Sequence, residues 1–370
     1  MPRHLYIHVP FCARRCAYCD FAIAVRRVVP VAEYVDAVAR ELAMRAPDDA
    51  PWEVDTLYLG GGTPSMLGAD GVARLLDRVR ERVRISPGAE VTLEANPENI
   101  TPESVRAWRA AGVGRLSIGA QSFDDRVLAW MHRTHDAERI VRAVEHARGE
   151  GIEDLSLDLI FALPESLERD WERDVRTALS LEPTHISLYG LTIEPDTPLG
   201  RWRDRGAVTE APEERYERDF LLAHDLLGAA GYDHYEVSNY GRAGHRARHN
   251  SSYWRHVPYM GVGPAAHSFD GASRRWNIAA YAEWARAVAA GRDPSAGAEV
   301  LTGEERAAER VYLGLRTIDG LDLDDAMARR VLPWLDTGWA TLSGTRLRLT
   351  ATGWLRLDAL AADLTLVGSR

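Results

Sequence analysis

The sequence predicts an α/β fold, a partial (β/α)6 barrel of TIM-like type, followed by a small α+β domain. Six short apolar runs alternate with longer amphipathic stretches, which is typical of a parallel sheet with crossover helices. No glycine-rich dinucleotide fingerprint follows the first run, and this disfavours a doubly wound sheet. Polar residues recur where the runs end, as at the functional edge of a barrel. Eight repeats are not visible, so we expect an incomplete barrel.

The expected elements follow in order. The strands are LYIHV (5–9), TLYLG (56–60), EVTLEA (90–95), RLSIGAQS (115–122), LSLDLIFALP (155–164) and HISLYGLT (185–192). Helices are expected around 31–45, around 69–84, from Pro102, in two stretches up to Gly149, and near 167–181. Thr101 is suited to cap the third helix, with Pro102 in its first turn.

The chain divides into three expected parts: a core over 1–200, an aromatic- and histidine-rich extension over 201–298, and a C-terminal domain over 299–370. The last part reads as helix (303–316), helix (323–336), hairpin (GWATLSGTRLRLT) and final helix, an order that suggests a winged-helix-like domain. Its second helix is rich in aspartate, whereas a DNA-recognition helix needs a basic face. We therefore expect a structural or protein-contact role for it.

Composition excludes several function classes. The net charge is −10, so nonspecific binding to nucleic acid is disfavoured. All 45 basic residues are arginine, so no step can use a lysine Schiff base or a P-loop lysine. No apolar run is long enough to span a membrane, and no secretory signal precedes the first strand. We expect a cytoplasmic protein with reduced thiols.

All three cysteines, Cys12, Cys16 and Cys19, lie within eight positions after the first strand. The odd number and the large size of the chain disfavour a disulfide framework, and clustered cytosolic thiols usually bind metal or do redox chemistry. Three thiolates can hold three irons of a [4Fe–4S] cluster, which normally takes four cysteines, and would leave one iron open for reaction. The alternative is a zinc site with His4 or His8 as the fourth ligand.

The spacing C-x3-C-x2-C, with Tyr18 before the third cysteine, resembles the signature of the radical S-adenosylmethionine (SAM) superfamily. GGGTP at 60–64 is similar to the motif that this family places after its second strand. The resemblance implies a [4Fe–4S] cluster on Cys12, Cys16 and Cys19, with SAM chelated by the open iron. The cofactor would then carry the chemistry while the protein orients it.

Other side chains are candidates for SAM contacts. Glu94 and Arg133 offer charge partners for its amino and carboxylate groups, and the glycines allow close backbone approach. Gln121 and Asp158 could bind ribose hydroxyls or a second ligand, and a charge within an apolar strand needs a partner. The residues that the resemblance implies for SAM are Tyr6, Tyr18, Gly61, Gly62, Thr63, Glu94, Gln121, Arg133 and Asp158. Catalytic residues are not assigned.

Further motifs, in order YIHVPFC, YLGGGTPS, LSIGAQSF, LDLIFALP and HNSSYW, resemble the coproporphyrinogen III dehydrogenase-like branch of this superfamily, which includes the HemW-type haem chaperones. The H-N-x-x-Y-W motif implies haem contact by His249, since imidazole is a good haem ligand and Tyr253 and Trp254 can cover a flat ring. A packed histidine with two core aromatics is the structural alternative. His267, in GVGPAAHSF, is a further candidate for the cofactor pocket.

The resemblance implies a chaperone that passes haem to acceptor proteins, with a low-potential electron donor such as a flavodoxin or ferredoxin, and any membrane contact is expected to be peripheral. The alternative is oxygen-independent oxidative decarboxylation of coproporphyrinogen III to protoporphyrinogen IX. Two departures disfavour it. Phe21 stands where the dehydrogenase usually has a further cysteine, and only eleven residues precede Cys12. A third class is a cluster protein with a structural or electron-transfer role.

Overall fold

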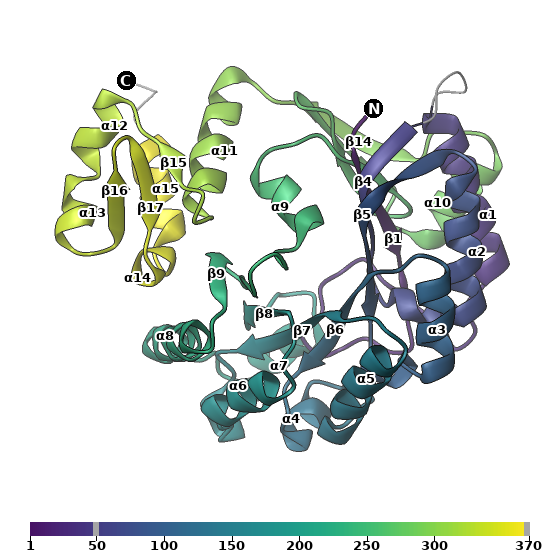
Figure 1. Cartoon of the computed structure of the whole chain (residues 1–370), viewed down its shortest axis with the longest axis horizontal. Coiled ribbons are helices and arrows are strands. Elements are labelled where there is room, and N and C mark those ends of the chain that lie inside the picture. The colour runs from purple at the N-terminus through teal and green to yellow at the C-terminus, as the bar shows by residue number, and fades with distance from the viewer. Residues whose placement is uncertain (47–51, 366–370) are drawn as a thin grey trace.

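Nine strands form one curved, mostly parallel sheet in the computed structural model, which describes residues 1–46 and 52–365 (Figure 1). The strand order is β11-β1-β4-β5-β6-β7-β8-β10-β9. Its centre consists of the six predicted strands, all parallel to their neighbours. These are β1 (His4–Val9), β4 (Trp52–Gly61), β5 (Val83–Ala95), β6 (Arg115–Gln121), β7 (Asp154–Phe161) and β8 (His185–Gly190).

The crossover helices lie on the outer, convex side of this sheet (Figure 1). The expected alternation is confirmed, and the sheet stays open because β11 and β9 form its two edges among the described residues. The helices are α1 (Val31–Arg45), α2 (Gly68–Arg80), α3 (Pro102–Ala110), α4 (Asp125–Trp130), α5 (Ala137–Gly149) and α6 (Trp171–Ser180), with short 3₁₀ turns at Pro64–Leu67, Pro97–Asn99 and Glu165–Leu167. In the part of the chain that is described, no helix combines the length and the apolarity needed to cross a bilayer.

Side-chain caps fix where the helices begin. Thr101 caps α3 as predicted: its hydroxyl accepts from the Ser104 N–H, and the Ser104 hydroxyl accepts from the Thr101 N–H. The helix expected near 167–181 starts later, at Trp171, because Asp170 caps it through the Arg173 N–H. The expected helix over 69–84 ends at Arg80, since β5 already begins at Val83 and is longer than predicted.

The core lies between the sheet and its outer helices. Leu5 and Ile7 of β1 and Leu57 and Leu59 of β4 are fully buried, and they pack in one cluster with apolar side chains of the outer helices. Strands buried on both faces read as near-continuous apolar runs, which is why they were visible in the sequence. The polar residues at their carboxyl ends are thereby directed to one edge of the sheet.

Residues 201–298 extend this sheet at both edges. β11 (Met260–Val262) pairs parallel with β1, and β10 (Asn239–Gly241) pairs antiparallel with both β8 and β9 (Asp233–Glu236). A separate three-stranded sheet contains β12 (His267–Phe269), β13 (Ser273–Asn277) and β14 (Ser295–Val300). The helices here are α7 (Pro198–Asp204), α8 (Glu213–Ala229), α9 (Arg248–Trp254) and α10 (Tyr281–Ala289).

The C-terminal part is an α+β unit of the predicted winged-helix-like order (Figure 1). Its elements are α11 (Gly303–Leu315), β15 (Leu321–Asp322), α12 (Asp325–Arg330), α13 (Leu332–Asp336), β16 (Ala340–Ser343), β17 (Arg346–Leu349), α14 (Ala351–Trp354) and α15 (Leu357–Thr365). The helix expected over 323–336 is two short helices, because Pro333 has no N–H to continue the hydrogen-bond ladder and instead opens the second helix.

Candidate functional site

The three cysteines lie on the loop that follows β1. Cys12 ends the short strand β2 (Phe11–Cys12), which pairs with β3 (Ala24–Val25) and closes the base of the loop. At its tip, the Ala17 N–H donates to the Met131 carbonyl and the Ala17 carbonyl accepts from the Leu199 N–H, at 3.0 and 2.8 Å. All three cysteines are free thiols. The loop is thus tied to segments far along the chain while its thiols stay unpaired.

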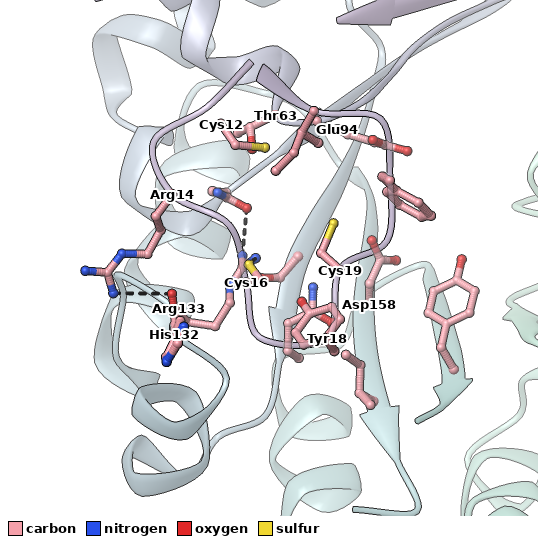
Figure 2. A pocket seen from close by; sticks show the side chains of 18 of the residues that line it. Cys12, Arg14, Cys16, Tyr18, Cys19, Thr63, Glu94, His132, Arg133 and Asp158 are labelled. Atoms are coloured by element: carbon pink, nitrogen blue, oxygen red, sulfur yellow. Dashed lines mark hydrogen bonds between the residues drawn. The ribbon is translucent and has the colours of Figure 1, made fainter. Parts of the chain in front are cut away.

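A cavity of about 450 Å³ opens at the carboxyl ends of the parallel strands, and all three thiols line it. In Figure 2 the cysteine side chains face the same space as Glu94 and Asp158. Eight of the nine residues implied for SAM contact also line it, from strands, from the loops that follow them and from the loop after α4: Tyr18, Gly61, Gly62, Thr63, Glu94, Gln121, Arg133 and Asp158. The exception is Tyr6.

Two glycines let the turn after β4 pack against the cysteine loop. A Cβ on Gly62 would lie 2.7 Å from the Pro10 carbonyl carbon, and one on Gly61 would lie 2.6 Å from the His8 ring. Gly61 also has a φ of +112°, which side chains rarely adopt. The Thr63 hydroxyl lies 3.4 Å from Cys12 Sγ. The GGGTP turn therefore holds the loop as well as exposing backbone to the cavity.

Glu94 is the acidic group of this cavity. Its carboxylate accepts from the Tyr58 hydroxyl at 2.8 Å and from the Gly61 N–H at 3.0 Å. Burial raises the pKa of Glu94 to about 7, against the opposing effect of the Tyr58 hydrogen bond. A cationic ligand group next to Glu94 would favour its ionised form, so the residue is suited to receive an ammonium group.

Arg133 is the matching cation, and its side chain is partly buried. One terminal nitrogen donates to the Asn96 amide oxygen (2.7 Å) and the Gly119 carbonyl (2.8 Å), and the other lies 3.4 Å from Cys16 Sγ. Among the described residues its Nε has no hydrogen-bond partner. A buried donor without a partner is costly, and an anionic ligand would satisfy it.

Asp158 and Gln121 also line the cavity. Asp158 accepts from the Ser117 hydroxyl at 3.0 Å and from Ser156 at 3.3 Å, and burial raises the pKa of its carboxyl. Gln121 ends β6 with a φ of +70°, a left-handed conformation that few non-glycine residues adopt. These two residues offer hydrogen bonds to hydroxyl groups of a bound ligand.

The thiols fit an iron–sulfur cluster better than a single metal ion. Cysteines that hold a cluster bind different irons and stand apart, whereas the ligands of one zinc converge on a point. Within residues 1–46 and 52–365, no three histidine, cysteine or acidic side chains are placed to bind one ion together. His4 pairs with Thr56 and His8 with Tyr6 and Ala22, and neither lines the cysteine cavity.

Tyr6 and His249 lie together elsewhere. Tyr6 lines a second cavity, its ring stacks on Tyr58, and its hydroxyl is 3.1 Å from His8 Nδ1. His249 is 1% exposed, and its two ring nitrogens are 2.7 Å from the Thr56 and Tyr253 hydroxyls. Burial lowers its pKa to about 3, so the imidazole is neutral. Neither residue lines the cysteine cavity, and His249 has no free ring nitrogen.

The geometry agrees with what comparisons with known proteins find. The sequence profile described as the Radical SAM superfamily matches residues 6–178. The heme chaperone HemW of Mycobacterium tuberculosis is 39% identical over 370 residues, covering 98% of this chain and 95% of the relative. The chain belongs to the HemW family of radical SAM proteins. Its HemW relatives include those of Synechocystis (38% identical; 87% of this chain, 79% of the relative) and Escherichia coli (39% identical; 72% and 70%).

A solved structure supports the fold of this HemW-family chain. The coproporphyrinogen III oxidase HemN of Escherichia coli superposes with a TM-score of 0.81, over 98% of this chain and 90% of that one. The two sequences are 23% identical, so this likeness concerns the fold. It covers the open sheet and the C-terminal unit of the HemW-family chain alike.

The sequence missed several residues that line the cavity of this HemW-family chain or hold its side chains in place. Asn96 orients Arg133, Tyr58 binds Glu94, and Ser117 binds Asp158. Asn96 directly follows β5, so the rule that polar residues mark strand ends could have found it. Tyr58 and Ser117 lie within apolar strands, and nothing in the linear sequence distinguishes them from core residues.

Proposed function

We propose that this HemW-family chain is a haem chaperone that holds a [4Fe–4S] cluster and SAM in the cysteine cavity and delivers haem to acceptor proteins. One observation supports the cofactor assignment: three free thiols, the unpartnered Nε of Arg133 and the carboxylate of Glu94 belong to residues that line one cavity. The haem part is supported by the relatives, which are named heme chaperones.

In this proposal Cys12, Cys16 and Cys19 each hold one iron. When bound, the cluster supplies an electron, received from a flavodoxin- or ferredoxin-like donor, to the ligand at its open iron. Arg133, 3.4 Å from Cys16 Sγ, offsets the negative charge of the thiolate and leaves its Nε for a ligand carboxylate. Tyr18, packed beside Met131 and Ile160, steadies the loop.

The remaining polar groups would orient SAM. Glu94 would take the ammonium group, and the exposed backbone at Gly61, Gly62 and Thr63 would lie along the ligand. Asp158 and Gln121 would bind its hydroxyls. Because Glu94 and Arg133 carry opposite charges, they would fix which end of an amino acid moiety faces which wall.

Haem would bind at the segment that contains HNSSYW. Direct ligation by His249 would require it to release Thr56 or Tyr253, since both ring nitrogens are engaged. Tyr253 and Trp254 offer apolar rings to a flat macrocycle. Haem contact by His249 and support of Tyr253 by His249 are therefore two roles that an experiment must separate.

The test is anaerobic reconstitution with iron and sulfide, followed by SAM binding and by haem titration of the full chain. The expected result is a [4Fe–4S] spectrum that changes with SAM, and saturable haem binding. His249→Gln, with His245→Ala as a histidine control outside both cavities, measures the contribution of the motif. A zinc-loaded protein, or a cluster that does not respond to SAM, would overturn the cofactor assignment.

The enzymatic alternative is tested with the same preparation. Reductant, SAM and coproporphyrinogen III are supplied without oxygen, and protoporphyrinogen IX is measured. We expect no product, since Phe21 replaces the further cysteine of the dehydrogenases. Turnover would reassign the chain to porphyrin biosynthesis while leaving the cluster assignment intact.

A further inference from the structure

A second cavity, of about 410 Å³, lies beside the first and has a different lining. It forms where the end of α9, the start of β12, β1 and α11 come together, and in Figure 1 α9 lies on the concave side of the sheet, facing α11. Tyr6 and His8 come from β1, Tyr253 and Trp254 from HNSSYW, and Leu313 from α11. Residues of β1, of the segment 253–274 and of α11, which are distant in sequence, thus build one cavity.

The walls of this cavity are flat and apolar. Tyr253 and Tyr259 meet edge to face with ring centroids 4.6 Å apart, and His256 stacks on Phe269 at 4.4 Å. Trp254 lines the cavity as well, and its outer face is covered by Arg316, 4.2 Å from the ring. A cavity lined mainly by aromatic rings suits a planar apolar ligand.

His267 is the histidine of this cavity with free ring nitrogens. It lies on β12, it is exposed, and no hydrogen-bond partner for its ring is found in residues 1–46 and 52–365. The Trp276 ring stacks beside it at 6.1 Å and supports its orientation. Partial burial, together with Arg274, lowers the pKa of His267, so the neutral form that ligates iron predominates at neutral pH.

The other histidines are already engaged. His8 contacts the Tyr6 hydroxyl and the Ala22 carbonyl, both at 3.1 Å, and His256 lies 3.0 Å from Glu309. His249 lies behind Tyr253, whose hydroxyl it contacts, and does not line the cavity. Arg274 is the arginine among the described residues that line this cavity; it pairs with Glu309 at 2.5 Å and more loosely with Glu299 at 3.6 Å.

We propose that haem binds in this second cavity, with His267 as an iron ligand and with Tyr253 and Trp254 against the macrocycle. This inference rests on the proposed haem-chaperone function and names its site. His249 is then a positioning residue, which holds Tyr253 through its hydroxyl. Arg274, whose contact with Glu299 is loose at 3.6 Å, would be available to pair with a carboxylate of the haem.

The test compares His267→Ala, His267→Met, His249→Gln and the control His245→Ala by haem titration of the full chain. We expect His267→Ala to weaken haem binding at least about tenfold and to change the spin state of the iron, because a metal ligand is lost. His267→Met should restore an axial ligand with an altered absorption spectrum, which a merely structural role would not produce. His249→Gln should keep the wild-type spectrum.

A metal-free porphyrin provides the second measurement. Protoporphyrin IX without iron should bind wild type and His267→Ala equally, since only the iron contact differs. Loss of the iron ligand in His249→Gln with no change in His267→Ala would overturn the site and leave the haem function standing. Absence of haem binding by the wild-type chain would overturn the proposed function itself. Thermal melts identify a variant that does not fold, and His267→Met then decides the assignment.

Discussion

The two cavities differ in chemistry and in the way the chain builds them. The cysteine cavity collects charged groups and thiols from the carboxyl ends of consecutive strands, a position that the α/β topology dictates. The aromatic cavity collects rings from β1, α9, β12 and α11, which no simple rule of topology brings together. The first is suited to a small charged cofactor and the second to a flat apolar ligand.

This difference shows how one sheet can serve two ligands. Side chains alternate along a strand, and the turn that follows a strand points to the edge of the sheet. The loop after β1 therefore reaches the cysteine cavity, while Tyr6 and His8, two positions apart, line the aromatic cavity. A variant in one cavity should change the binding of that cavity's ligand and leave the binding in the other cavity unchanged.

The largest effect is expected from Cys16→Ser. One of three cluster ligands is lost, so the reconstituted protein should contain little iron and sulfide and should lack the cluster spectrum. Haem affinity should change by less than about twofold, because distant sites act independently. Loss of haem binding in parallel with the cluster would contradict the separation of the two cavities.

Next in size is the effect of Glu94→Gln on stability. Burial raises the pKa of Glu94 from 4.5 to about 7, so the folded state binds a proton that the unfolded state releases. Stability from this group is fully present below pH 4.5 and is lost as pH rises through 7, an effect of about 3 kcal/mol. In urea titrations, the free energy of unfolding of Glu94→Gln should rise relative to that of the wild type between pH 5 and pH 8.

Glu98→Gln is the matched control for that measurement. Although burial opposes it, hydrogen bonds from His135 and Thr134 hold the pKa of Glu98 at about 2, so this group stays ionised over the whole range. The difference between Glu98→Gln and wild type should therefore be constant from pH 5 to pH 8. A constant difference for Glu94→Gln would mean that its carboxyl has an ordinary pKa.

A smaller effect is expected on cofactor affinity. The ionised fraction of a carboxyl with a pKa of about 7 rises about tenfold between pH 6 and pH 8, and only the ionised form attracts an ammonium group. The SAM affinity of the wild type, divided by that of Glu94→Gln, should increase about tenfold over this range in calorimetric titrations. A ratio independent of pH would remove Glu94 from the ligand contacts.

The smallest effect concerns Tyr253→Phe. The ring remains, and only the hydroxyl that contacts His249 is lost, so stability should fall by about 1 kcal/mol. Haem affinity should fall no more than about threefold, because the apolar contact persists. A much larger loss of haem would mean that the hydroxyl itself contacts the ligand. Calorimetric unfolding and haem titration measure the two effects.

The sequence predicted the parts of the molecule that depend on local order. Buried parallel strands read as apolar runs, and Glu94 and Gln121 were found because polar residues at strand ends converge on one edge. Asp158 lies in the middle of β7 and was found as a charge within an apolar run. The family motif added Arg133, which lies on the loop after α4, away from any strand end.

The sequence could not predict the aromatic cavity, because its walls depend on long-range pairing. β11 lies beside β1 although more than 240 residues separate them, and this pairing brings His267 near His8. Tyr6 and His267 were expected at the cofactor pocket, yet they line the aromatic cavity. Polar and apolar residues alternate along β1, so Tyr6 and His8 share a face, but the cavity that this face borders is completed by segments more than 240 residues away.

The imidazole of His8 lies between the two cavities. Gly61, in the turn that borders the cysteine cavity, has no room for even a methyl group against this ring, whose other neighbour is the aromatic cavity. A side chain at position 61 would push this ring toward the aromatic cavity, so the glycine there allows the two sites to act independently.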